Sequence, residues 1–223
     1  MNKAELVLAD ASKDLGPPEG KCCAMPGSTI KGTYFFGGAG MDGNYIEPLV
    51  RALREAGIKS ATYVSKEKWS AGTAMDAAIG SIIGREYDRK FPMLLRTSNV
   101  SSQQFNLIGY SYGSIVAAQL AAKYASKGTP IDNLVLIGSP LSKNFVLLLK
   151  NLMYLKKLVI INLDKQGDPI YAGMSVIELF SKLPLLASQM PESKGHFYYA
   201  NPTEVGNKRR KSLAEELFKI GLR

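Results

Sequence analysis

Residues 106–114 of the sequence read NLIGYSYGS, with Ser111 between Gly109 and Gly113. The apolar run QFNLI before the first glycine is typical of a short strand, and the alanine-rich run SIVAAQLAAKYA after the second is typical of an amphipathic helix. A serine between two glycines at such a junction is the pattern of a sharp turn that exposes a nucleophilic hydroxyl. The pattern is short enough to arise by chance, so the rest of the chain has to decide whether Ser111 is a nucleophile or an ordinary loop serine.

The wider pattern of the chain predicts the α/β class. Short apolar runs alternate with longer segments of helical periodicity, which is typical of a mostly parallel central sheet with helices on both faces. The expected strands are Thr33–Phe36, Ser60–Val64, Phe105–Ile108, Leu134–Ile137 and Leu158–Leu163. The expected helices are Tyr45–Ala56, Ala71–Arg89, Gly113–Ala125, Lys143–Leu155 and Ser212–Ile220. With 223 residues, we expect one domain over residues 29–223 and an N-terminal arm over residues 1–28 that is wrapped on it or frayed from it.

A serine hydroxyl needs a base to take its proton, and the chain contains a single histidine, His196. Alone, such a histidine is more often a packing or surface residue. The carboxylate that would orient its ring is expected in the segment LVIINLDKQGDPIYAG, which offers Asp164 and Asp168. We favour Asp168 because a glycine and a proline flank it in a defined turn, whereas Asp164 could belong to the strand tip or make structural hydrogen bonds.

These motifs together resemble the α/β-hydrolase superfamily. GYSYG follows a strand, GDPI follows a later strand and GH stands near the C-terminus, in the chain order Ser111, Asp168, His196. The resemblance covers about residues 30–220 and is closest to small esterases and lipases of the cutinase-like kind. It implies an α/β-hydrolase fold with a catalytic triad, a serine esterase or lipase activity and no cofactor. Thioesterase or small-ester esterase activity, and an inactive hydrolase-fold binding module, are the alternatives.

The resemblance also implies an oxyanion hole. One donor would be the backbone N–H of Tyr112. The other would be that of Ala39, with its neighbours Gly40 and Met41 as alternatives, in the loop GGAGMDG that follows the strand ending at Phe36. Gly37 stands where many members of the superfamily carry His-Gly, which weakens the subfamily assignment but leaves a backbone donor in place. The loop lacks the lysine of a phosphate-binding loop, so nucleotide binding is disfavoured. The residues expected to border the substrate are Gly38, Gly40, Met41 and Tyr110.

Charge and apolar patterning bear on the substrate and partners. The net charge of +9 includes the run Lys208–Lys211, which could contact an anionic membrane surface or form a solvated helix face. Nucleic acid is disfavoured because no recognisable nucleic-acid-binding motif accompanies the charge. The apolar segment Met174–Met190 could be a lid or acyl-chain wall, or a helix packed onto the sheet. An apolar cover beside a basic surface favours lipid esters, including phospholipids, as substrates and therefore a lipid-degrading lipase or phospholipase.

The sequence shows neither the hydrophobic region of a secretory signal nor a run of about eighteen uncharged apolar residues. A cytoplasmic location is therefore the default expectation. The GGAG segment loosely resembles the start of bacterial lipase effectors, which are delivered without a signal peptide, so secretion by that route is the alternative. The adjacent Cys22 and Cys23, with one histidine in the chain, cannot complete a metal site, and no metal is expected.

Overall fold

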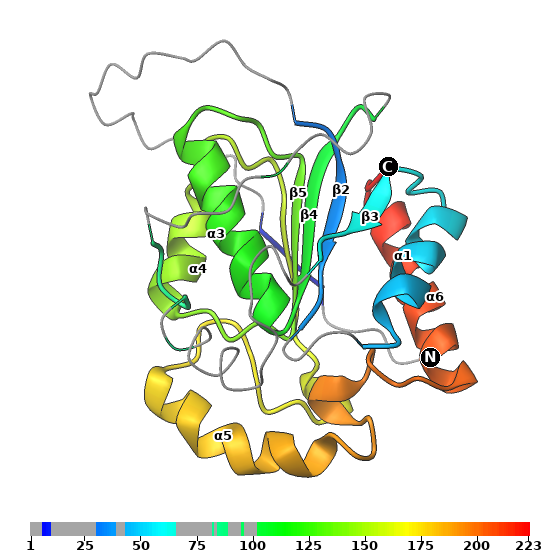
Figure 1. Cartoon of the computed structure of the whole chain (residues 1–223). Helices are drawn as coiled ribbons and strands as arrows, with labels where there is room; N and C mark the ends of the chain where they lie inside the picture. The colour runs from blue at the N-terminus through cyan, green and yellow to red at the C-terminus, as the bar shows by residue number, and fades with distance from the viewer. Residues whose placement is uncertain are drawn as a thin grey trace.

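The computed structural model describes residues 6–9, 30–38, 43–65, 82, 84–88, 95 and 102–223. Within them, one sheet runs in the order β1-β6-β5-β4-β2-β3 (Figure 1). Its strands are β1 (Leu6–Ala9), β2 (Gly32–Phe36), β3 (Ala61–Tyr63), β4 (Phe105–Tyr110), β5 (Asn133–Ile137) and β6 (Leu158–Ile161). Strands β2 to β6 are parallel, and β1, from the expected N-terminal arm, pairs antiparallel with β6 at the edge. The predicted mostly parallel sheet is confirmed.

Helices cover both faces of this sheet (Figure 1). α3 (Tyr112–Ser126) and α4 (Lys143–Lys150) lie on one face, and α1 (Ile46–Glu55) and α6 (Glu204–Lys219) lie on the other. Because successive strand residues point to opposite faces, Phe36 packs in the cluster around α3 and its neighbour Phe35 packs in the cluster around α1 and α6. Both side chains are fully buried. This two-sided burial explains why the strands read as continuous apolar runs in the sequence.

Several predicted boundaries differ from the observed ones. α4 ends at Lys150 rather than Leu155, because Leu155 instead bridges to Ile131 beside the sheet. α6 begins at Glu204 rather than Ser212, so the basic run lies inside the helix. Of the predicted helix Ala71–Arg89, the described residues 84–88 form turns and irregular chain, and the others except Ile82 lie outside the described residues.

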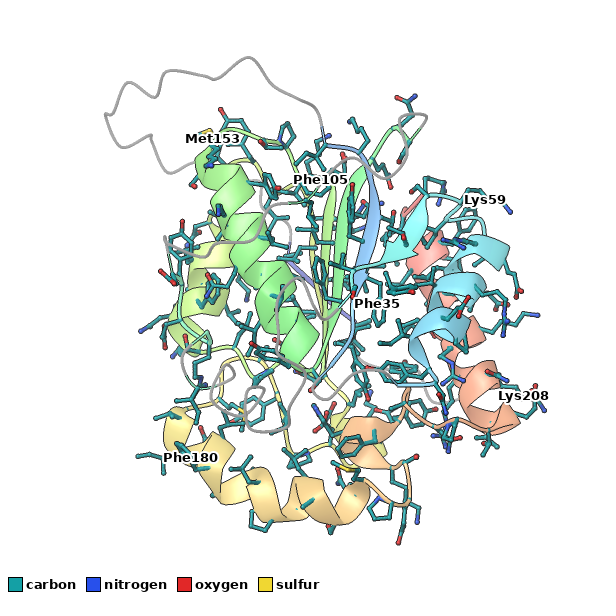
Figure 2. All side chains as sticks on the ribbon, in the orientation of Figure 1. Phe35, Lys59, Phe105, Met153, Phe180 and Lys208 are labelled. Atoms are coloured by element: carbon teal, nitrogen blue, oxygen red, sulfur yellow. The ribbon has the colours of Figure 1, made fainter. Side chains whose placement is uncertain are left out.

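The apolar segment Met174–Met190 contains a helix, α5 (Val176–Gln189), that lies across the carboxyl ends of the strands (Figure 1). Leu179 is its one buried residue, and it belongs to a small cluster with Ile170 and Met174 that is separate from the two clusters flanking the sheet. The alternative of a helix packed onto the sheet is therefore wrong. Figure 2 shows Phe180 on α5, well away from the sheet around Phe35.

Candidate active site

Ser111 stands at the carboxyl end of the central strand β4, directly before α3. Its backbone has φ 55° and ψ −124°, a conformation that is strained for a residue with a side chain. The flanking glycines are required by space. A Cβ at Gly109 would lie 2.3 Å from the Cα of Ser114, and a Cβ at Gly113 would lie 2.2 Å from the carbonyl oxygen of Phe36. The G-x-S-x-G spacing thus follows from the close approach of strand and helix backbone on either side of the serine.

Three predicted side chains come into hydrogen-bond contact at this end of the sheet. Ser111 Oγ lies 2.6 Å from Nε2 of His196, and Nδ1 of the same ring lies 2.8 Å from Oδ2 of Asp168. His196 belongs to η3 (Gly195–Phe197), and Asp168 follows η2 (Asp164–Gln166) after β6. The fold thus joins residues that are 85 and 28 positions apart in the chain.

The environment of Asp168 distinguishes it from Asp164. The Asp168 side chain is completely buried, and its second oxygen, Oδ1, accepts a hydrogen bond of 2.8 Å from the N–H of Ile170. Asp164 is exposed in η2. Gly138, after β5, has φ +53° and leaves room for the pair, since a Cβ there would lie 3.1 Å from Oδ2 of Asp168. Nothing in the sequence near Gly138 signals its contact with Asp168.

The main chain of His196 is held by two side chains. Gln189, the last residue of α5, accepts a 3.0 Å hydrogen bond from its N–H through Oε1. The hydroxyl of Tyr110 donates to its carbonyl oxygen, and the phenol ring stacks beside the imidazole at an interplanar angle of 22°. Burial raises the pKa of Tyr110 well above its ordinary value, so its hydroxyl stays protonated as a donor.

Tyr110 was expected to border the substrate, but it is 3% exposed and its ring stacks against the imidazole of His196. Only its position beside the serine marked it in the sequence, and that position does not reveal which way the ring points. Gln189 was missed altogether, since a glutamine in an apolar helical segment carries no sequence signal of its own.

The loop expected to supply the second oxyanion donor is described only in part. Tyr112 is the first residue of α3, so its N–H lies at the positive end of the helix dipole and next to Ser111. The N–H of Gly38 donates a 2.9 Å hydrogen bond to the hydroxyl of Tyr45, which anchors the start of the loop. Ala39, Gly40 and Met41 lie outside the described residues.

The basic run does not form one solvated face. Arg210 is 1% exposed and donates hydrogen bonds to the carbonyl oxygens of Tyr199 and Asn201, both 2.7 Å long. Burial lowers its pKa from the ordinary value. The guanidinium of Arg209 lies 4.0 Å from the ring centroid of Tyr198. The two arginines thus brace the segment that follows His196, and Lys208 and Lys211 are the exposed members of the run.

Within the ranges given above, no three His, Cys, Asp or Glu side chains are grouped so that they could hold a metal ion. None of the helices in the same part of the chain combines the length and the apolar character needed to cross a bilayer.

Comparison with known proteins gives one match. A family model for the alpha/beta hydrolase fold matches residues 99–162, a segment that holds Ser111 and its flanking glycines and runs through β6. Neither a curated protein nor a solved structure matches the chain. This match agrees with the parallel sheet and with the serine turn at the end of its central strand. Together the three observations suggest a hydrolase. The chain has an α/β-hydrolase fold.

Proposed function

We propose that the protein is a serine-dependent carboxylic ester hydrolase that acts on lipid esters through an acyl-enzyme. The observation that carries the proposal is the pair of contacts at His196, 2.6 Å to Ser111 Oγ and 2.8 Å to Asp168 Oδ2. Acyl transfer by a serine needs a nucleophile, a base in contact with it and a carboxylate that orients the base, and these two contacts provide that arrangement. The strained backbone of Ser111, presented at a helix N-terminus, gives further support.

Acylation follows from the contacts. Because the Asp168 carboxylate accepts a hydrogen bond from Nδ1 of His196, the lone pair of Nε2 faces Ser111. Nε2 takes the hydroxyl proton as Oγ bonds to the ester carbonyl carbon, and the carbonyl oxygen becomes an oxyanion near the N–H of Tyr112. When the intermediate collapses, the bond to the leaving alkoxide breaks, and the imidazolium returns the proton to it. The alcohol departs and the acyl group remains on Ser111.

Deacylation repeats these steps with water. His196 takes a proton from water as its oxygen bonds to the acyl carbon, and then returns the proton to Ser111 Oγ when the acid leaves. The buried carboxylate of Asp168 stabilises the imidazolium in both halves of the reaction. Atoms and charge balance with water as the only co-reactant, and no metal or cofactor takes part.

The apolar side of α5 supports lipid esters as the substrate class. Its end contacts His196 through Gln189, and its exposed side chains include Ile177 at 78% and Phe180 at 49%. Leaving such side chains in water is unfavourable by about 25 cal/mol per Å² of apolar surface, which an acyl chain or a lipid phase would recover. The proposed partner is therefore a lipid phase, with an anionic membrane surface attracted by exposed lysines such as Lys208 and Lys211.

The test begins with the serine. A fluorophosphonate probe should label the wild-type protein and fail to label Ser111→Ala. A series of p-nitrophenyl and glyceryl esters from acetyl to palmitoyl, with acyl thioesters beside them, then fixes the scissile bond and chain length. The proposal expects activity to increase with acyl length. If the probe labels the protein but acetyl esters or thioesters are the preferred substrates, the serine mechanism is supported and the lipid-ester substrate class is contradicted. An unlabelled wild-type protein would favour a binding module.

A further inference from the structure

Both polar groups of the His196 main chain are bonded by side chains from other elements, β4 and the end of α5. Gln189 Oε1 accepts the N–H, and the Tyr110 hydroxyl donates to the carbonyl oxygen. Main-chain groups of a short 3₁₀ turn such as η3 more often bond to neighbouring backbone or water. Fixing both groups leaves the imidazole little freedom beyond its own two side-chain torsions.

Each of these two residues is also linked to one of the other two triad residues, Ser111 or Asp168. Tyr110 immediately precedes Ser111 on β4. The amide of Gln189 uses its other end, Nε2, to donate a 2.7 Å hydrogen bond to the carbonyl oxygen of Gly167, which immediately precedes Asp168. The nucleophile segment, the base and the acid turn are therefore linked by two side chains that take no part in the proton transfers.

The Gln189 amide packs closely against Gly195, which has no side chain to displace it. Gly195 has φ +51°, and a Cβ built there would lie 2.3 Å from Gln189 Oε1 and 2.5 Å from Nε2. A side chain at position 195 would therefore displace the amide from both of its partners. Glycine at position 195 therefore allows both the positive φ of the turn and the close approach of the Gln189 amide.

We infer that Gln189 and Tyr110 are positioning residues that together hold His196 at its working distance from Ser111 and Asp168. The inference rests on the proposed function for its catalytic consequence. Tyr110, Gln189 and the two main-chain groups of His196 that they bond are called the backbone clamp below. Misplacing a reacting group by about 1 Å can cost up to about 100-fold in rate, so loss of the clamp should reduce kcat.

Steady-state kinetics on p-nitrophenyl butyrate give the first measurement. Gln189→Ala and the isosteric Gln189→Met should lower kcat by roughly 10- to 100-fold with KM changed less than about twofold, because the clamp bonds the main chain of the base. Gln189→Glu keeps an acceptor for the His196 N–H but sets a carboxylate oxygen against the Gly167 carbonyl, so an intermediate loss is expected. Ser188→Ala is the matched control, since its hydroxyl donates to the carbonyl oxygen of Leu185 within α5 and kcat should not change.

The single histidine permits a second measurement that does not depend on activity. In ¹⁵N-labelled protein, the ring Nδ1–H resonance can come from His196 alone, and its downfield position reports the hydrogen bond to Asp168. Gln189→Ala and Gln189→Met should shift this resonance upfield or broaden it. Ser188→Ala should leave it in place.

Tyr110→Phe tests the other half of the clamp. Because removing a buried hydroxyl also costs stability, the control is Tyr34→Phe, which removes a comparable buried donor to the carbonyl of Lys31 on the opposite face of the sheet. Both variants should lose thermal stability, and only Tyr110→Phe should lower kcat and move the ring resonance. Gly195→Ala should reproduce the kcat loss of Gln189→Ala, and the double variant should be no slower than Gly195→Ala alone.

Two results overturn the inference. One is unchanged kcat, within about twofold, in the folded Gln189→Ala and Tyr110→Phe variants. The other is a kcat loss without any change at the His196 ring, which would assign the effect elsewhere. If the wild-type protein neither reacts with a fluorophosphonate nor hydrolyses esters, the proposed function fails, while the ring resonance still decides whether Gln189 and Tyr110 hold His196.

Discussion

Gly113 touches the end of β2: a Cβ at this position would lie 2.2 Å from the carbonyl oxygen of Phe36 and 2.2 Å from that of Gly37. The first turn of α3 therefore rests on the backbone where the glycine-rich loop begins. From the sequence, one oxyanion donor is expected at the start of α3 and the other in that loop. A side chain at position 113 would therefore push the start of α3 away from the end of β2.

Replacing Gly113 by Ala should therefore destabilise the protein severely, because two backbone carbonyls and a methyl group would compete for one space. We expect a loss above about 3 kcal/mol, measured by chemical denaturation, since backbone cannot yield as a side chain does. Gly221→Ala is the control. Gly221 has φ +111° but open space around it, so its replacement should cost about 1–2 kcal/mol from conformation alone. Equal losses would show that the Gly113 contact is not tight.

The strained backbone of Ser111 predicts a difference between two inactive variants. Ser111→Ala and Ser111→Gly should both abolish probe labelling and lower kcat by at least about 10³-fold. Relief of φ 55°, ψ −124° is worth about 1–3 kcal/mol, whereas the greater freedom of glycine in the unfolded chain costs about 0.4–1 kcal/mol. Thermal denaturation should then show Ser111→Gly to be more stable than Ser111→Ala by about 1 kcal/mol. A less stable glycine variant would contradict the stored strain.

The two aspartates after β6 should behave oppositely. Asp168→Asn would present an amide donor to Nδ1 of His196 and favour the wrong tautomer, so kcat should fall by about 10³- to 10⁴-fold. Asp164→Asn changes an exposed residue and should leave kcat within about twofold of wild type. Steady-state kinetics on a short soluble ester measure both. An inactive Asp164→Asn beside a normal Asp168→Asn would reverse the assignment.

Polar replacements on the exposed side of α5 should slow the hydrolysis of long-chain esters and leave that of short-chain esters unchanged. Ile177→Ser with Phe180→Ser removes two largely exposed apolar side chains, so thermal stability should change by less than about 0.5 kcal/mol. Hydrolysis of palmitoyl esters and binding to lipid vesicles should decline several-fold, while butyryl ester turnover stays the same. Leu179→Ser is the contrasting variant, because Leu179 is buried and its loss should destabilise the protein. Uniform effects on long and short esters would argue against contact between α5 and lipid.

The basic run should divide into exposed and structural members. Lys208→Gln with Lys211→Gln should weaken binding to anionic vesicles by up to about 1 kcal/mol per residue, most clearly at low salt, with butyryl ester turnover unchanged. Arg210→Gln should instead lower stability by about 2–4 kcal/mol, because it strips partners from the carbonyls of Tyr199 and Asn201. Vesicle co-sedimentation over a salt series and thermal denaturation make the two measurements. Salt-independent binding would remove the anionic surface as a partner.

Much of the fold followed from patterns that are local in the chain. The apolar runs around Phe36 and Val135 are buried on both faces of the sheet, so composition alone marks them as central strands. Gly109 is required by the nearby backbone of Ser114, whereas Gly113 is required by the carbonyl oxygens of Phe36 and Gly37, which lie far away in the chain. The start of α6 was misjudged because its first two turns carry Gly206 and a run of charge, and the buried contacts of Arg210 stabilise them.

The sequence by itself determined the class of fold, the serine turn and the one histidine that could serve it, since each depends on residue type, local spacing or a count. The flanking Gly167 and Pro169 favoured Asp168, but tertiary structure decided which aspartate meets His196, because the turn after β6 directs Asp164 to solvent and Asp168 to a closed space beside Gly138. It also decided the roles of Tyr110, Gln189 and Arg210. Their contacts reach residues 86, 22 and 11 positions away. A hydrogen bond across such separations depends on where two elements pack, and no periodicity within either element records it.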